Sequence, residues 1–165
     1  MNYLSLDKYR YAWFYQHQEM PVPQDALDLI QPMTPQRSQT LWNTFISQHA
    51  DHPESFTGKD WASHGKQWEE GDLPWQAAWD SSDPSLPEGI DAYIPWDDQT
   101  VVYFCYQSEH VVETRWSVFK AHWKNFLFLD DGPILIGKKR KEVVQFQQNG
   151  RYRLGTRPSN TDALG

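Results

Sequence analysis

The sequence predicts a single α+β domain with an antiparallel sheet, packed helices and a C-terminal β-hairpin. Three observations support this fold class: a run of β-favouring residues at 100–106, apolar residues at helical spacing over 114–125, and two alternating segments on either side of Gly150. The length of 165 residues is typical of one domain. We therefore expect one domain over residues 1–158 and a mobile tail over 159–165, which has no apolar surface to bury.

The first part of the chain, up to about Pro95, predicts few regular elements. Aromatic residues at 11–15 favour a short strand, and residues 25–30 favour one or two helical turns. Thr34 followed by Pro35 predicts a helix start, because the hydroxyl caps the first N–H groups and proline needs no partner there. That helix should end at about residue 47 or 49 and bury one apolar stripe, which is formed by Leu41, Trp42, Phe45 and Ile46.

Residues 51–98 hold tryptophans scattered among glycine, proline and carboxylates, with neither helical nor strand periodicity. The chain has nine tryptophans, and those of this segment are Trp61, Trp68, Trp75, Trp79 and Trp96. Two interpretations stay open: the rings pin an irregular segment onto the sheet, or some of them form an exposed aromatic platform. We favour the first, because large apolar rings in such a stretch need something to cover them.

The second part of the chain gives clearer signals. Residues 100–106 form an uninterrupted β-favouring run, which predicts a central strand covered on both faces. Thr114 predicts the cap of a helix that ends at about residue 125. The side chains expected to pack that helix on the sheet are Trp116, Phe119, Trp123 and Phe126 or Leu127. Residues 127–129 and 133–136 predict two short strands joined by a turn.

The last two strands are separated by residues 148–150. A two-residue turn would mix apolar and basic side chains on each face of the hairpin. A three-residue loop with Gly150 in the left-handed conformation separates them. In the register that we expect, the paired residues are Phe146 with Tyr152 and Val144 with Leu154. The side chains left together on the outer side are Gln145, Gln147, Arg151 and Arg153.

The net charge of −7 is unevenly distributed, since the first 98 residues carry −11 and the rest +4. The acidic first part argues against nucleic acid as the main partner, because phosphate binding requires accumulated positive charge. It favours a basic protein partner, and the alternative that the carboxylates only confer solubility stays open. The basic residues over 138–157 favour a solvated strand connection, because the hairpin register turns Phe146 and Tyr152 toward the core and away from the arginines. The alternatives are an anionic or intramolecular acidic partner and a nucleic acid.

No catalytic or metal-binding pattern emerges from the sequence. Cys105 lies in the predicted central strand, which indicates an inert core thiol. We expect solvated, capping or turn-forming roles for the other titratable clusters, which are His49, Asp51, His52 and His64; Glu109, His110 and Glu113; Asp97 and Asp98; and Asp130 and Asp131. No glycine-rich phosphate loop or nucleophile elbow occurs, so we predict no metal and no cofactor and lean against an enzyme.

These observations favour a non-enzymatic module that binds a basic protein partner. The candidate partner-binding residues are Trp61, Trp68, Glu69, Glu70, Asp72 and Trp75. An alternative is a small-ligand or carbohydrate-binding protein, in which exposed tryptophans stack on the ligand; the candidates are Trp61, Trp68, Trp75 and Trp96. A weaker alternative is a hydrolase, in which His49, His52 or His110 lies beside a carboxylate in a cleft.

No apolar stretch has the length of a signal peptide core or of a membrane span. The single cysteine cannot form a disulfide within the chain. We therefore expect a cytoplasmic location and no membrane partner.

A resemblance adds to this interpretation. The spacing Trp116-x2-Phe119-x3-Trp123-x2-Phe126, followed by Asp131-Gly132-Pro133 and the hairpin at Gly150, resembles a small uncharacterised family of gammaproteobacteria, a domain of unknown function of similar length. The resemblance implies a bacterial cytoplasmic protein and carries over no catalytic residue. A weaker similarity, to the α+β immunity proteins encoded beside bacterial toxins, depends on the small size, the acidic balance and the strand-helix-hairpin ending.

Overall fold

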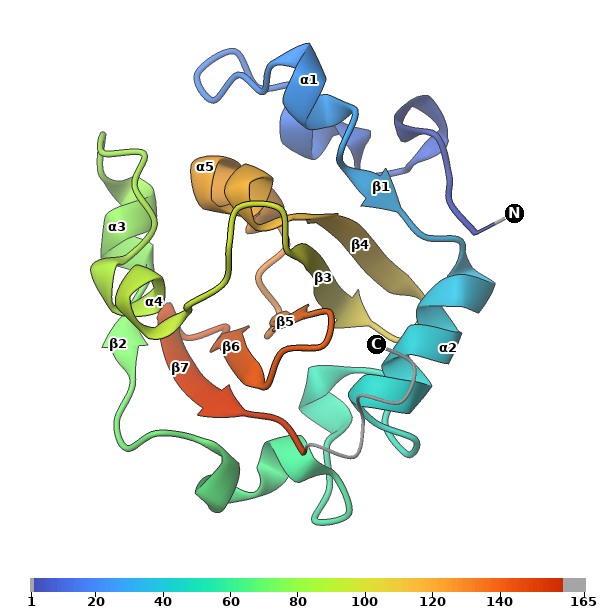
Figure 1. Cartoon of the computed structure of the whole chain (residues 1–165), viewed down its shortest axis with the longest axis vertical. Helices are drawn as coiled ribbons and strands as arrows, with labels where there is room; N and C mark the ends of the chain where they lie inside the picture. The colour runs from blue at the N-terminus through green and yellow to red at the C-terminus, as the bar shows by residue number, and fades with distance from the viewer. Residues whose placement is uncertain (1, 159–165) are drawn as a thin grey trace.

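The computed structural model describes residues 2–158, which form one antiparallel sheet flanked by helices (Figure 1). The strands lie in the order β1-β4-β3-β5-β6-β7-β2, and every neighbouring pair is antiparallel. Their bounds are β1 Gln31–Pro32, β2 Leu73–Pro74, β3 Val101–Gln107, β4 His110–Arg115, β5 Ile134–Gly137, β6 Glu142–Phe146 and β7 Arg151–Thr156. The predicted α+β fold class is confirmed, and the predicted tail at 159–165 lies outside the described residues.

Helices cover both faces of the sheet. Their bounds are α1 Gln24–Leu27, α2 Pro35–Phe45, α3 Gln76–Asp80, α4 Glu88–Tyr93 and α5 Trp116–Phe126. Figure 1 shows α3 and α4 beside β2 and β7, at the end of the sheet away from β1 and α2. Within the part of the chain that the structure describes, no helix is long and apolar enough to cross a bilayer.

Two apolar cores lie on opposite faces of the central strands, because successive side chains of a strand point to opposite faces. The first core joins α5, α4 and the aromatic N-terminal segment to Phe104 and Phe146. The second core joins α2 and the segment 56–68 to Tyr103 and Cys105. This double cover explains why β3 is buried from residue 102 to residue 106, as predicted for a central strand.

The helix predicted after Thr34 is confirmed as α2. The Thr34 Oγ1 atom accepts a hydrogen bond from the backbone N–H of Arg37 at 3.3 Å, and Pro35 occupies the first helical position. The helix ends at Phe45, slightly before the predicted end. All four side chains of the predicted apolar stripe are buried in the second core, namely Leu41, Trp42, Phe45 and Ile46.

The C-terminal hairpin has the predicted register. Phe146 pairs with Tyr152 and Val144 with Leu154, and Gly150 has a φ of 84°, in the left-handed region that favours glycine. The prediction that the other face is an outer side is wrong for Gln145, which is buried. The second core covers that face, and the Arg153 Nε donates to the Gln145 Oε1 at 2.8 Å.

The strand predicted at 11–15 is wrong, because Ala12–Tyr15 forms a 3₁₀ turn. The backbone N–H of Phe14 donates to the Tyr11 carbonyl at 2.9 Å, which closes the turn. Phe14 and Tyr15 are both buried although they are adjacent, so the segment lacks the alternation of a half-buried strand. Aromatic composition alone does not separate these two structures.

Two further predictions around α5 are wrong. Thr114 does not cap the helix: it is a buried residue of β4, and Arg115 precedes the first helical residue. Residues 127–129 form a turn after α5 rather than a strand, and only the second predicted strand exists, as β5. The helix itself is confirmed, since its predicted packing residues, from Trp116 to Leu127, are buried in the first core.

Indole N–H groups hold much of the irregular structure in place. Seven of the nine tryptophans donate Nε1–H to an oxygen of another residue, and the pairs are Trp42 with Ala50, Trp61 with Phe45, Trp68 with Ala62, Trp75 with Gln147, Trp79 with Lys124, Trp96 with Glu142 and Trp123 with Pro84. Three of the rings from the segment 51–98 are buried, namely Trp68, Trp75 and Trp96. Their burial supports the interpretation that the rings pin this segment onto the sheet.

The edge strands of the sheet are short and contain proline. β1 and β2 have two residues each, and their second residues are Pro32 and Pro74. The outer side of β1 is covered by the N-terminal residues, because the Leu4 N–H donates to the Pro32 carbonyl at 2.8 Å. Proline at an edge removes a hydrogen-bond donor that another strand could use.

Candidate functional site

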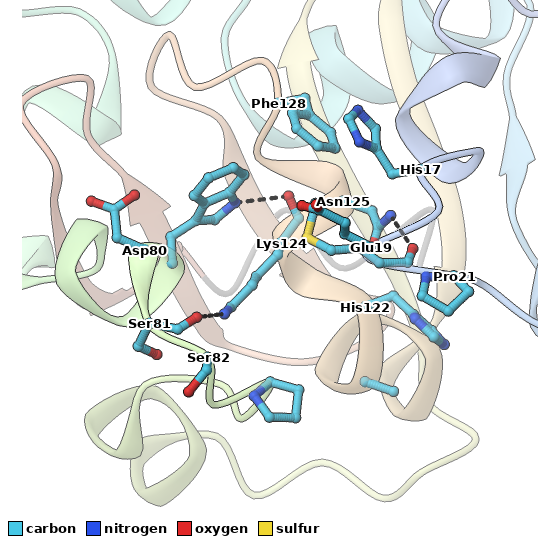
Figure 2. A pocket seen from close by; sticks show the side chains of 14 residues that line it. His17, Glu19, Pro21, Asp80, Ser81, Ser82, His122, Lys124, Asn125 and Phe128 are labelled. Atoms are coloured by element: carbon cyan, nitrogen blue, oxygen red, sulfur yellow. Dashed lines mark hydrogen bonds between the residues drawn. The ribbon is translucent and has the colours of Figure 1, made fainter.

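A cleft of about 730 Å³ lies beside the C-terminal half of α5, between three segments that are far apart in the sequence (Figure 2). The loop 17–21 forms one side, the end of α3 with the turn 80–84 forms another, and residues 121–128 form the third. We call this cavity the α5 cleft. Its volume lies within the range of about 300 to 1,000 Å³ that is typical of small-molecule sites.

Aromatic rings form one wall of the α5 cleft. The rings of His17 and Phe128 stack with centroids 4.6 Å apart, and the Trp79 ring meets Phe128 edge to face at 5.6 Å. Trp13 also packs against this group, with its ring centroid 5.5 Å from that of Phe128, and the residue is 48% exposed. Such a wall can stack on a flat or sugar-like ligand.

Lys124 brings a buried positive charge to the cleft. The residue is only 9% exposed, and its Nζ donates to the Ser81 carbonyl at 2.8 Å, as Figure 2 shows. Among the residues that the structure describes, the ion pairs within 4.0 Å do not include Lys124. An ammonium has three N–H donors, so two donors remain for another acceptor.

Hydrogen bonds to α5 fix the position of the other two sides. The Asn125 Nδ2 donates to the carbonyls of Phe14 at 2.8 Å and Met20 at 3.1 Å, which holds the N-terminal loop. The Trp79 Nε1 donates to the Lys124 carbonyl at 2.9 Å, which holds the end of α3. These hydrogen bonds fix the three sides of the cleft relative to one another.

His122 marks a kink in α5. Its backbone, at φ −129° and ψ 24°, departs from helical geometry, and its side chain lines the cleft. Burial lowers the pKa of His122 and Asp25 opposes this effect, so a neutral imidazole is favoured. Glu19 and Asp80 are exposed residues of the lining. Within residues 2–158, hydrogen bonds join neither His17 nor His122 to a carboxylate.

The tryptophans among the predicted partner-binding residues lie in the cores. Trp68 is buried, and the Arg153 guanidinium lies 3.9 Å from the centroid of its ring. Trp61 is half-buried and stacks on Trp68 with centroids 6.1 Å apart. Trp75 is buried in the first core, on the other face of the sheet. The structure therefore does not bring these three rings together on one surface.

The predicted acidic residues do lie together. Glu69, Glu70 and Asp72 line a shallow hollow of about 160 Å³ beside β2 and β7. Glu69 and Glu70 are exposed, whereas Asp72 is paired with Arg151 through a contact of 2.6 Å between Oδ1 and Nε. Leu73, at the edge of this hollow, is 49% exposed.

His110 is the most perturbed of the predicted candidates for acid–base chemistry. Its ring stacks between Tyr11 and Tyr106, with centroids at 4.8 and 4.3 Å, and its Nε2 is hydrogen-bonded to the Tyr9 hydroxyl. Burial lowers the pKa of His110 from 6.5 to about 4. The neighbouring carboxylates face elsewhere, because the Glu113 side chain accepts from Tyr3 and the Glu109 side chain from Gln39.

Within residues 2–158, His49 and His52 lie near carboxylates but are not hydrogen-bonded to them, and the His64 Nε2 is hydrogen-bonded to the Gly58 carbonyl oxygen at 2.8 Å. His49 and Asp51 line one shallow groove, and His52 and Asp131 line a separate small pocket of about 150 Å³. The His52 Nδ1 accepts from the Glu54 N–H instead. In the described part of the chain, no group of three histidine, cysteine, aspartate or glutamate side chains could hold a metal ion. Cys105 is fully buried, and burial raises the pKa of its thiol.

Several of the basic residues over 138–157 form contacts within the protein. Arg151 pairs with Asp72, and the Arg140 Nη2 lies 3.8 Å from the Asp97 Oδ2. Phe146 and Tyr152, the aromatics between these basic residues, are buried in the first core. An aromatic platform for nucleic-acid bases is therefore not formed here.

Sequence reasoning missed the residues of the α5 cleft. Phe128 belongs to residues 127–129, for which the sequence predicts a strand and the structure has a turn. The one signal in the sequence is the set of tryptophans of residues 51–98, which includes Trp79 and which needs other segments to cover it. The three sides of the cleft are separated by about 40 residues or more, so local pattern cannot join them.

Comparison with known proteins identifies the family of the chain but no function. No curated protein matches it. A family model described as "Protein of unknown function (DUF2947)" matches residues 3–155, which is nearly all of the described structure. This agrees with the resemblance to an uncharacterised domain of similar length. The chain therefore belongs to the DUF2947 family of proteins of unknown function.

Proposed function

We propose that the protein binds a small organic ligand in the α5 cleft. The observation that carries this proposal is a cleft of about 730 Å³ in which an aromatic wall faces a buried ammonium group. Small-molecule sites combine apolar and aromatic lining with a few polar groups that fix the orientation of the ligand. The hydrogen bonds from Asn125 and Trp79 supply the rigid frame that such a site requires.

This proposal differs in its residues from the ligand-binding alternative that the sequence offers. Trp68, Trp75 and Trp96 are buried and donate their indole N–H groups within the protein. The rings available for stacking are those of Trp79 and Phe128, with Trp13 next to them.

A screen of aromatic fragments by nuclear magnetic resonance would test the proposal. Binding in the α5 cleft should shift the indole N–H resonance of Trp79 in a saturable way, because this group donates to the backbone of the cleft. The resonance of Trp75, which donates to the Gln147 carbonyl outside the cleft, is the internal control and should not move. Phe128→Leu should weaken binding by about tenfold through the loss of ring stacking. Equal shifts at both indoles, or none, would contradict the proposal.

A protein-binding module for a basic partner is the second candidate function. It is supported by the exposed pair Glu69 and Glu70 beside the exposed apolar side chain of Leu73. Opposite charges accelerate the encounter of two proteins, and a central apolar contact slows their separation. In this candidate role the chain would act in the bacterial cytoplasm, in an immunity-like manner against a basic protein.

Charge neutralisation tests this second candidate. In Glu69→Gln/Glu70→Gln, association with a basic partner purified by means of the tagged chain should slow by about tenfold at low salt. Asp72 is left intact, because its removal would leave Arg151 without its carboxylate. The matched control is Asp7→Asn/Asp28→Asn, which changes the charge equally at exposed positions of the N-terminal segment. Unchanged association rates in the first variant would remove this candidate.

A further inference from the structure

We propose that the ligand of the α5 cleft is an aromatic molecule with a single carboxylate, which pairs with the ammonium of Lys124. This inference rests on the proposed function and names the chemical class of the ligand. It depends on three features of the cleft: the unused donors of Lys124, the sign of the charge around it, and the aromatic wall.

Lys124 supplies the ammonium group of the cleft, which has hydrogen-bond donors to spare. The N–H groups of Trp79 and Asn125 already donate to backbone carbonyls. The Lys124 Nζ donates to one carbonyl, that of Ser81, and the residue is nine-tenths buried. A buried ammonium is costly unless it is paired, and a carboxylate in the cleft would satisfy its remaining donors.

The surrounding charges favour one negative charge on the ligand over two. The lining residues Glu19 and Asp80 are exposed carboxylates, and the exposed Asp83 already interacts electrostatically with Lys124, so a dianion is repelled as it enters. Lys124 belongs to the last turn of α5, where the helix dipole presents partial negative charge. A phosphate monoester is usually held by a helix N-terminus or by a forked guanidinium, and the described lining supplies neither.

The aromatic wall defines the body of the ligand. His17 and Phe128 lie on the side of the cleft opposite the loop of Ser81 and Ser82 (Figure 2), and Trp79, in the segment that leads into that loop, meets the Phe128 ring edge to face. A flat ring system that stacks on this wall buries apolar area, while a carboxylate attached to it reaches toward the Lys124 Nζ. The two requirements together describe an aryl carboxylic acid.

The test compares 2-naphthoate with 2-naphthamide, which has the same ring system and a neutral amide in place of the carboxylate. Calorimetry on the wild-type chain should show the acid binding at least about tenfold more tightly than the amide. Both should shift the Trp79 indole resonance. This comparison needs no variant, so it does not depend on the stability of an altered protein.

Variants of Lys124 then test whether its positive charge causes the preference for the acid. Lys124→Met should remove the preference for the acid, and Lys124→Arg should keep most of it. Lys120→Met is the matched control: it removes the same charge one turn earlier on α5, from a residue that pairs with Asp98 at 3.4 Å outside the cleft. Its preference for the acid should equal that of the wild type.

The outcomes separate this inference from the proposed function. If both probes shift Trp79 and bind equally well, the cleft binds ligands but the carboxylate inference is overturned. A preference for the acid that survives in Lys124→Met also overturns it. If neither probe shifts the Trp79 resonance, the carboxylate inference is overturned. If, in addition, no fragment in the wider screen shifts this resonance, the proposed function is overturned as well.

Discussion

Replacing Gly155 by alanine is expected to lower the free energy of unfolding by about 3 kcal/mol, because β7 has no room for a side chain there. A Cβ atom at this position would clash with the Gln67 carbonyl oxygen and lie 2.8 Å from the Trp68 ring. Both contacts belong to the segment that covers the second core, and the backbone of that segment cannot move aside without lifting Trp68 off the sheet.

Chemical denaturation followed by tryptophan fluorescence would measure this loss. The matched control is Gly58→Ala, in the same covering segment, where an added Cβ meets no atom within 4 Å. That substitution should change the free energy of unfolding by less than about 0.5 kcal/mol. Similar stabilities for the two variants would show that the segment adapts freely and does not lie tightly on β7.

Acidification from pH 6.5 to pH 4 is expected to remove about 3 kcal/mol of stability through His110 alone. The pKa of this imidazole falls from 6.5 to about 4 on folding, because the ring is buried between two tyrosines. Between these two pH values the unfolded chain binds a proton that the folded chain does not. Protonation therefore favours unfolding, and the stability contributed by neutral His110 is fully present only above pH 6.5.

His110→Phe isolates this contribution. Phenylalanine keeps an aromatic ring between Tyr11 and Tyr106 but cannot take up a proton. The variant should be less stable than the wild type at neutral pH, because the Tyr9 hydroxyl loses its partner. Between pH 6.5 and pH 4, the free energy of unfolding of the variant should nevertheless decrease by about 3 kcal/mol less than that of the wild type. Parallel curves for the two proteins would contradict the assignment.

The parts of the fold that were predicted correctly have local causes. The hairpin register follows from one glycine at the left-handed position and from alternation on both sides of it. The start of α2 follows from a threonine and a proline next to each other. In both cases the residues that determine the geometry are neighbours in the sequence, so the local sequence is sufficient to predict the element.

The wrong predictions concern residues whose environment is supplied by distant segments. Thr114 looks like a helix cap, but pairing of β4 with β3 takes it into a strand. Gln145 lies at a position of the hairpin where alternation predicts an exposed side chain. The segment that contains Trp68 covers this face of the sheet. The three aromatic residues at 12–15 are compatible with a buried strand and with a buried turn. The packing around Phe14 favours the 3₁₀ turn.

The candidate site was beyond sequence reasoning for the same reason. The acidic pair Glu69 and Glu70 could be chosen because charge is visible in the sequence, and both residues are exposed. The α5 cleft exists only because Asn125 and Trp79 join segments from three parts of the chain. A single sequence contains no signal that these segments meet.

The proline-containing edges of the sheet limit how this protein can recognise another chain. Many proteins bind peptides by β-augmentation, in which the peptide becomes an additional strand and is held through its backbone. Here β1 is covered by the N-terminal residues, and β2 offers two residues, of which Pro74 has no N–H group. The two edge strands therefore offer few backbone groups to an added strand, which also disfavours edge-to-edge pairing between copies of the chain.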